Sequence, residues 1–261
     1  MAAKLALVTG ASGGIGHEFA KQLAQAGYNL ALVARSKHKL ERIAAELRAQ
    51  FGIDAQVVVC DLSTPNAAHD VQTQVPECDV LVNNAGFANN GKFAQLDENA
   101  TLEEIQVDIV ALTQLTRVYL PGMIARKDGK ILNVASTAGF LPGPNMAVYY
   151  AGKAYVISFS EALAEEVRGT GVTVTVLCPG ATETGFAERS GTTTTPLFKL
   201  PMAKADDVAK AGIEGMMRGK SVVVPGITNK LVAISPKITP RRLLVAISGK
   251  AVEASETRPP S

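Results

Sequence analysis

Short apolar runs alternate along the chain with longer segments in which apolar residues recur at helical spacing. The runs are four to six residues long and rich in Val and Leu, as buried strands are. Strands that alternate with amphipathic helices form a parallel sheet covered by helices on both faces. The predicted strands are 5–9, 29–34, 55–59, 80–83, 130–134, 172–177 and 221–224, and the predicted helices are 14–26, 37–50, 66–73, 102–126, 149–168 and 205–218.

This alternation predicts an α/β fold with one doubly wound, seven-stranded parallel sheet. We expect a single domain over residues 1–226, because no internal repeat or linker interrupts the pattern. Residues 227–261 are predicted to form a basic C-terminal extension that packs on the domain or on a neighbouring subunit. Ligands of such sheets bind outside the carboxyl ends of the strands.

Three long loops are expected at that edge of the sheet, at 85–99, 135–148 and 179–204. The run of four threonines at 192–195 predicts a mobile loop within the third.

The formal charge of +2 is too small to indicate nucleic acid as a partner. Residues 227–261 hold six Lys or Arg and two Asp or Glu, a local charge of +4. Segment 229–252 mixes basic and apolar residues, so it fits either packing on protein or contact with an anionic membrane surface. We expect a cytoplasmic protein, because neither a signal peptide nor a membrane span is recognisable.

The three cysteines and three histidines show no metal-ligand spacing. We therefore expect Cys60, Cys78 and Cys178 to be reduced core thiols and predict no metal site.

A glycine-rich turn, TGASGGIG at 9–16, follows the first strand and precedes a helix. Gly10, Gly14 and Gly16 let the backbone approach a pyrophosphate, which the N–H groups at the helix N-terminus then bind. The same letters satisfy the GxSxG pattern of hydrolases, with Ser12 as nucleophile. That interpretation needs a histidine later in the chain, and none follows His69.

Arg35 stands at the end of the second strand. An acidic residue there selects NAD, whereas an arginine pairs with the 2′-phosphate of NADP(H). The sequence therefore predicts NADP(H); the alternative is a solvated arginine at a helix start. Further phosphate contacts would come from Ser12, Ser36, Lys37 or Lys39.

Tyr149 and Lys153 lie four positions apart on a predicted helix and therefore share one face. A neighbouring ammonium lowers the pKa of a phenol, which makes Tyr149 a usable proton donor or acceptor. Tyr150 is a rival phenol, but it would point away from that face. Ser136 follows a predicted strand, where its hydroxyl can donate to a substrate carbonyl oxygen.

Together these features resemble the short-chain dehydrogenase/reductase family, whose fold is of the Rossmann type. The resemblance rests on TGASGGIG at 9–16, CDLS at 60–63, NNAG at 83–86, Ser136, the spacing of Tyr149 and Lys153, and Pro179-Gly180, and it covers about residues 5–225. It implies Ser136, Tyr149 and Lys153 as catalytic residues, and a homodimer or homotetramer. The cofactor-binding residues that it implies or that the turn predicts are Gly10, Ser12, Gly14, Ile15, Gly16, Arg35, Asp61, Leu62, Asn83, Ala85, Gly86, Tyr149, Lys153, Pro179, Thr182 and Thr184.

One position departs from the family pattern. Many members have an asparagine where this chain has Asp108, and its main-chain carbonyl holds a water next to the catalytic lysine. Asp108 keeps a carbonyl, so the relay can survive, but a carboxylate there can also alter the helix kink or the local field.

We expect an oxidoreductase, a ketoreductase in character, that moves a hydride between NADP(H) and a small-molecule carbonyl or secondary alcohol. The alternative is a non-catalytic NADP(H) sensor with the same fold. An apolar substrate is predicted from the apolar residues of the loops, because such residues line pockets for apolar groups. These residues are Phe87, Phe93, Phe140, Leu141, Pro142, Met146, Phe186, Leu197, Phe198, Leu200 and Met202.

Overall fold

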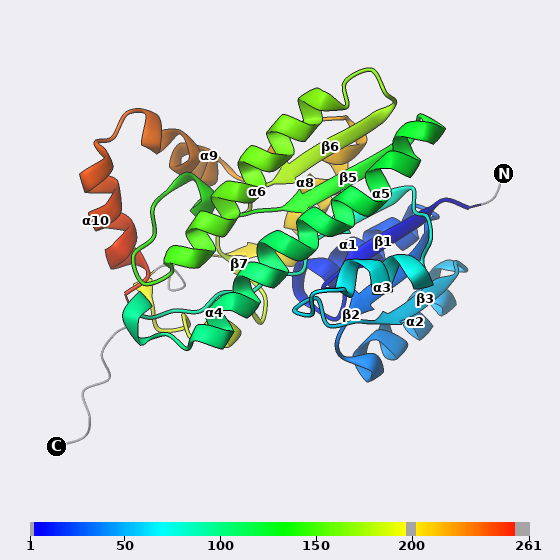
Figure 1. Cartoon of the computed structure of the whole chain (residues 1–261), viewed down its shortest axis with the longest axis horizontal. Coiled ribbons are helices and arrows are strands. Elements are labelled where there is room, and N and C mark those ends of the chain that lie inside the picture. The colour runs from blue at the N-terminus through cyan, green and yellow to red at the C-terminus, as the bar shows by residue number, and fades with distance from the viewer. Residues whose placement is uncertain (1–2, 197–201, 254–261) are drawn as a thin grey trace.

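The computed structural model describes residues 3–196 and 202–253 and contains a seven-stranded parallel sheet (Figure 1). The strand order is β3-β2-β1-β4-β5-β6-β9, so β1 is an interior strand between β2 and β4, and the order reverses between β1 and β4. The strands are β1 (Leu5–Thr9), β2 (Asn29–Ala34), β3 (Ala55–Val59), β4 (Val80–Asn83), β5 (Gly129–Val134), β6 (Val172–Leu177) and β9 (Val222–Val223).

Alternating residues of each strand supply two hydrophobic cores, one on each face of the sheet. Ala6 and Val8 of β1 face the core formed with α1 (Gly14–Gln25), α2 (Lys37–Phe51) and α8 (Ala205–Met217). Leu7 faces the opposite core, which includes side chains of α3 (Ala67–Gln74), α5 (Leu112–Arg126) and α6 (Ala147–Glu166). The structure is thus a Rossmann-like single domain of three layers, as predicted.

The predicted helix over 102–126 is longer and less regular than expected. It begins with α4 (Glu98–Ile105), where the carboxylate of Asp97 accepts the N–H of Ala100 at 2.8 Å. A π-helical segment, η2 (Gln106–Ala111), then separates α4 from α5. Such wide turns within a helix occur often at functional sites.

The described part of the loop after β6 has secondary structure of its own. It contains β7 (Thr182–Glu183), α7 (Phe186–Ser190) and β8 (Ala203–Lys204), and β7 pairs with β8. Thr192 and Thr195 are fully buried. The Thr195 hydroxyl donates to the Thr192 carbonyl at 2.8 Å, which satisfies the polar groups and permits this burial.

The C-terminal segment folds into α9 (Ile227–Ile234), the short 3₁₀ helix η5 (Ser235–Lys237) and α10 (Arg241–Ala251). In Figure 1 these helices stand at the end of the molecule away from β2 and β3. None of the helices among the described residues combines the length and apolar character that a bilayer crossing requires.

Candidate active site

A cleft of about 1300 Å³ opens at the carboxyl ends of the strands. Its wall includes the glycine turn after β1, the ends of β2 and β4, the start of α6 and the inner sides of α9 and α10. This is the edge at which the strand order reverses and at which ligands of such sheets bind.

The glycine turn is shaped for close approach of a ligand to the backbone. Gly10 and Gly14 have φ values of 67° and 56°, in the left-handed region that favours glycine. A Cβ at Gly16 would lie 2.3 Å from the carbonyl oxygen of Gly10, so only glycine lets α1 pack this tightly on the turn. The first turn of α1 contains no acidic residue, and Gly14 and Ile15 at its start line the cleft, so this helix N-terminus can bind an anion there.

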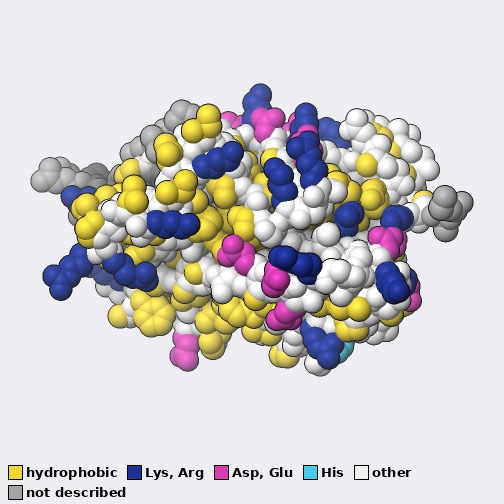
Figure 2. Space-filling model, turned by 90° about the horizontal axis from the view of Figure 1, so that it is seen from above, with side chains coloured by type: hydrophobic (Ala, Val, Ile, Leu, Met, Phe, Trp, Pro, Cys, Tyr) yellow, Lys and Arg dark blue, Asp and Glu magenta, His cyan; other side chains and the backbone are white. Residues whose placement is uncertain are grey.

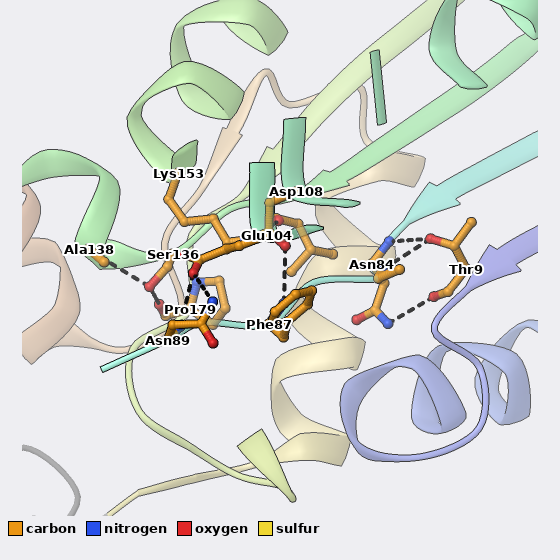
Figure 3. A network of polar contacts seen from close by, with 12 residues as sticks. Thr9, Asn84, Phe87, Asn89, Glu104, Asp108, Ser136, Ala138, Lys153 and Pro179 are labelled. Carbon is orange, nitrogen blue, oxygen red and sulfur yellow. Dashed lines mark hydrogen bonds and ion pairs between the residues drawn. The ribbon is translucent and has the colours of Figure 1, made fainter. Parts of the chain in front are cut away.

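Thr9 connects the glycine turn to the end of β4 (Figure 3). Its hydroxyl accepts the backbone N–H groups of Asn84 at 2.9 Å and Ala85 at 3.0 Å. The side-chain amide of Asn84 donates in return to the Thr9 carbonyl at 2.9 Å. The two backbone segments that flank the strand reversal are thereby held in fixed positions.

The predicted phosphate contacts at the end of β2 divide into two groups. Arg35, Ser36 and Lys39 line the cleft. Lys37 instead forms an exposed ion pair with Glu41 at 3.7 Å and does not line it. A phosphate at this end of the cleft would therefore meet Arg35 and Lys39.

Tyr149 and Lys153 lie on one face of α6, as their spacing predicts. The Lys153 Nζ is 5.3 Å from the centre of the Tyr149 ring, and both side chains line the cleft. Ser136 caps the 3₁₀ helix η3 (Thr137–Phe140), where its hydroxyl accepts the N–H of Ala138 at 3.1 Å. It also interacts with the phenol of Tyr149.

Tyr150 also lines the cleft and lies 6.2 Å from Tyr149 between ring centres. Its ring packs directly against Gly143, where an added Cβ would meet it at 2.3 Å. Burial raises the pKa of the Tyr150 phenol to about 12.

Burial also raises the pKa of the Tyr149 phenol above its usual range, and the Asp108 carboxylate adds to the rise. Lys153 and Ser136 oppose this rise, as the sequence suggested for Lys153, but they do not reverse it. Tyr149 is therefore a protonated phenol at neutral pH, ready to donate its proton.

The departure at Asp108 brings a carboxylate onto the ammonium group of Lys153 (Figure 3). The Asp108 Oδ2 lies 2.8 Å from the Lys153 Nζ, and the two side chains are 2% and 6% exposed. The other oxygen, Oδ1, accepts the N–H of Phe87 at 3.0 Å. Burial disfavours the ammonium of Lys153, yet Asp108 and other acidic groups raise its pKa overall. From the sequence, the main-chain carbonyl of Asp108 was expected to act near Lys153 through a water molecule. In the structure the side-chain carboxylate of Asp108 contacts Lys153 directly.

Glu104 is a second buried carboxyl group near this pair and was not predicted. Burial raises its pKa to about 7, and the charge of Asp108 adds to the rise. Its Oε2 accepts the backbone N–H of Asn89 at 3.0 Å and the side-chain amide at 2.8 Å (Figure 3). Its Oε1 is buried without a hydrogen-bond partner among the described residues.

Most of the predicted cofactor residues line the cleft, and two do not. Gly16 lies behind the turn. Asn83 is buried in the sheet, where its amide donates to Thr116 at 3.1 Å and Asn133 at 2.9 Å, and its neighbour Asn84 lines the cleft instead. Those on the wall are Gly10, Ser12, Gly14, Ile15, Arg35, Asp61, Leu62, Ala85, Gly86, Tyr149, Lys153, Pro179, Thr182 and Thr184.

The substrate end of the cleft is apolar, although only part of the predicted set forms it. Phe93 is 65% exposed, and Phe140 packs with the core beside β6. Arg189, which was not predicted, lies 4.4 Å from the ring centre of Phe87 and also lines the cleft. Leu197, Phe198 and Leu200 lie outside the described residues. The predicted apolar residues on the wall are Phe87, Leu141, Met146, Phe186 and Met202.

The glycine turn, the strand order and the arrangement on α6 are found together in known proteins. A family model described as short chain dehydrogenase matches residues 4–195. The chain belongs to the short-chain dehydrogenase family. It is thus an oxidoreductase by family, and its Rossmann-like fold is the one that binds nicotinamide cofactors in these enzymes.

Two relatives within the short-chain dehydrogenases act, by name, on acyl chains. The chain is 34% identical over 227 residues to a very-long-chain 3-oxoacyl-CoA reductase of Anas platyrhynchos, covering 84% of this chain and 72% of that protein. It is 38% identical over 192 residues to a granaticin polyketide synthase putative ketoacyl reductase of Streptomyces violaceoruber, covering 71% and 70%. Other curated relatives are longer, and the chain spans 52% of one from Laccaria bicolor.

A solved short-chain dehydrogenase from Sphingobium yanoikuyae in complex with NADPH matches almost the whole chain. The TM-score is 0.82, the identity is 29%, and the match covers 98% of this chain and 100% of that one.

Proposed function

We propose that this short-chain dehydrogenase is an NADP(H)-dependent reductase of a carbonyl group on an apolar, acyl-type substrate. One observation carries the proposal: the Tyr149 phenol, the Lys153 ammonium and the Ser136 hydroxyl converge in the same cleft as the glycine turn. The names of the relatives support a 3-oxoacyl or ketoacyl substrate, and the apolar wall of the cleft supports an apolar one.

The residues of the glycine turn fit a dinucleotide. The turn leaves no room for a Cβ at Gly16, and the N-terminus of α1 presents N–H groups without competing acids. Arg35 and Lys39 supply positive charge at the end of β2, where a 2′-phosphate would bind. These residues would hold NADP(H), which supplies the hydride when it is bound.

The chain's own residues would then handle the substrate oxygen. The Ser136 hydroxyl would donate a hydrogen bond to the carbonyl oxygen and stabilise the negative charge that develops on it. The Tyr149 phenol would transfer its proton to that oxygen and become a phenolate. The Lys153 ammonium, held by Asp108, would stabilise this phenolate and later help return the proton.

The reaction is tested by following the loss of NADPH absorbance with a panel of 3-oxoacyl thioesters, hydrophobic ketones and small charged oxoacids. Wild type should turn over the apolar substrates best. Tyr149→Phe should lower kcat at least about 100-fold because it removes the proton donor. Tyr150→Phe is the matched control, because it removes the neighbouring phenol from α6, and it should retain most activity. Tight NADPH binding without turnover would instead support a cofactor sensor.

The cofactor preference is tested by Arg35→Ala. Charge-assisted hydrogen bonds to a phosphate contribute about 1.5–3 kcal/mol, so the Kd for NADPH should rise by about 10- to 150-fold. The Kd for NADH, which lacks the 2′-phosphate, should stay within about twofold. Equal weakening of both cofactors would refute the role of Arg35.

We further propose a homodimer or homotetramer that buries part of α5 and α6. Tyr155 of α6 is 38% exposed, and its ring stacks on Phe159. Its hydroxyl forms a hydrogen bond with the hydroxyl of Thr113 on α5, so a partly exposed aromatic surface spans the two helices. Light scattering on the purified chain tests this, and a strict monomer would refute it.

A further inference from the structure

The C-terminal helices carry a concentration of exposed apolar side chains. Seven of the twelve large apolar side chains that are exposed in the described part of the chain lie between residues 227 and 247. On α9 they fall at i, i+4 and i+7, which places them on one side of the helix. We define the outer face of α9 and α10 as Ile227, Leu231, Ile234, Ile238 and Leu243, which are 50–80% exposed.

The charges beside this outer face have a single sign. Segment 227–252 contains five cationic side chains and no Asp or Glu. Figure 2 shows Lys and Arg side chains among hydrophobic ones at the end of the molecule where α9 and α10 lie. The cations are Lys230, Lys237, Arg241, Arg242 and Lys250.

The two helices are fixed parts of the fold. Leu244 and Val252 are buried against the domain. The Ser248 hydroxyl donates to the carbonyl of Pro142, and the Asn90 amide donates to the carbonyl of Val252 at 3.0 Å. The apolar outer face is therefore held in one orientation rather than displayed on a loose tail.

The neighbouring sides of the same helices, about 100° around each helix axis from the outer face, form part of the cleft wall. Thr228, Val232 and Ser235 line the cleft from α9 and the start of η5, again at i, i+4 and i+7. Leu244 and Ser248 line it from α10. The outer face thus adjoins the substrate end of the cleft on both helices.

We propose that the outer face of α9 and α10 docks the protein on the surface of an anionic lipid bilayer. Helices that lie in a membrane interface combine an apolar stripe with flanking Lys and Arg, and their binding strengthens with anionic lipid. At 8 and 11 residues, α9 and α10 are of a length to lie along such a surface.

The charge pattern favours a bilayer over a second copy of the chain. A twofold contact would place the outer face against itself. Five cations of one copy would then face five of the other with no acidic partner in segment 227–252, which is repulsive. An anionic lipid surface satisfies the apolar side chains and all five cations at once.

Docking in this orientation places the wall of the cleft at the bilayer surface. An apolar substrate dissolved in lipid would then reach the cleft past α9 and α10 without crossing water. This goes beyond the proposed reaction, and vesicle binding tests it without any turnover.

The experiment is sedimentation of the full chain with vesicles of phosphatidylcholine alone or phosphatidylcholine mixed with phosphatidylglycerol. Wild type should partition at least tenfold more strongly onto the anionic vesicles, and added salt should weaken this binding. Ile227→Ser/Leu231→Ser should lower partitioning at least tenfold. The matched control, Val59→Ser/Leu102→Ser, removes two exposed apolar side chains elsewhere and should bind like wild type.

A second pair of variants tests the charges separately. Each Lys or Arg near an anionic surface changes partitioning about fivefold, so Lys237→Glu/Arg242→Glu should lower it well beyond tenfold. Arg42→Glu/Arg168→Glu changes the net charge equally at exposed sites distant in sequence and is the control. The proposal is overturned if the wild type does not bind vesicles. It is also overturned if Ile227→Ser/Leu231→Ser and Lys237→Glu/Arg242→Glu both bind vesicles like the wild type. Loss of an oligomer in the Ile227→Ser/Leu231→Ser variant without vesicle binding overturns it in favour of a second copy.

Discussion

Replacing Asp108 by asparagine tests whether the buried ion pair holds Lys153 in place beside Tyr149. The substitution keeps the shape and leaves an oxygen to accept the N–H of Phe87, so the main loss is the negative charge. Removing one partner of a buried pair costs about 3–5 kcal/mol, and the low end applies because Lys153 can release its proton. We expect a loss of about 3 kcal/mol and a Tm lower by roughly 6–12 °C.

A double-mutant cycle separates the pair from the packing around it. Lys153→Met alone leaves the Asp108 carboxylate buried without its cation and should cost a similar amount. Asp108→Asn/Lys153→Met removes both charges, so its stability should lie within about 1 kcal/mol of wild type. Because each single variant should lose about 3 kcal/mol and the double variant at most about 1 kcal/mol, chemical denaturation of all four proteins should give a coupling energy of about 5 kcal/mol or more. Single effects that add to within about 0.5 kcal/mol would refute the ion pair.

The same substitution has a signature in the pH dependence of activity. Asp108 raises the pKa of the Tyr149 phenol, so asparagine should lower it. Carbonyl reduction needs the protonated phenol and is lost as the pH rises through this pKa. The alkaline limb of the kcat profile should therefore move to lower pH in Asp108→Asn. An unchanged limb would show that the carboxylate does not act on Tyr149.

Three further substitutions test other parts of the site. The pKa of the Glu104 carboxyl group is about 7 in the folded protein, above its value in the unfolded chain. Its contribution to the free energy of unfolding is therefore fully present below about pH 4.5 and is lost as the pH rises through about 7. Glu104→Gln should therefore gain about 1–3 kcal/mol over wild type at about pH 8, as denaturation at several pH values will show. Gly16→Ala brings a Cβ to 2.3 Å from the Gly10 carbonyl, so calorimetry should show at least about tenfold weaker NADPH binding. Asn133→Ala removes the acceptor of the Asn83 amide and should lower the free energy of unfolding by about 2–3 kcal/mol; an unchanged denaturation midpoint would refute this.

The sheet was readable from the sequence because its strands are buried on both faces. Buried parallel strands appear as continuous apolar runs, and six of the seven were predicted with bounds that differ from those observed by at most one residue. The last strand was predicted as 221–224, and only Val222–Val223 pair with β6. Its neighbours Pro225 and Gly226 turn the chain away.

The burial of the two carboxyl groups near Lys153 could not be predicted from the sequence in the same way. Glu104 and Asp108 lie four positions apart, a pattern that normally marks a solvated helix face. The π-helical segment changes the helical spacing near Asp108, and the N–H groups of Asn89 and Phe87 come from a loop that periodicity does not describe. Contacts between elements distant in sequence decide this site.

The position of β1 between β2 and β4 imposes an order on the assembly of the sheet during synthesis. Leu5 pairs with Asn29 on one side, whereas Ala6 pairs with Val80 on the other. One edge of the first strand therefore stays open until β4 leaves the ribosome, and an open strand edge invites pairing with other chains. The charges of Lys37, Lys39, Glu41 and Arg42, which emerge in that interval, would help to keep the nascent segment in solution.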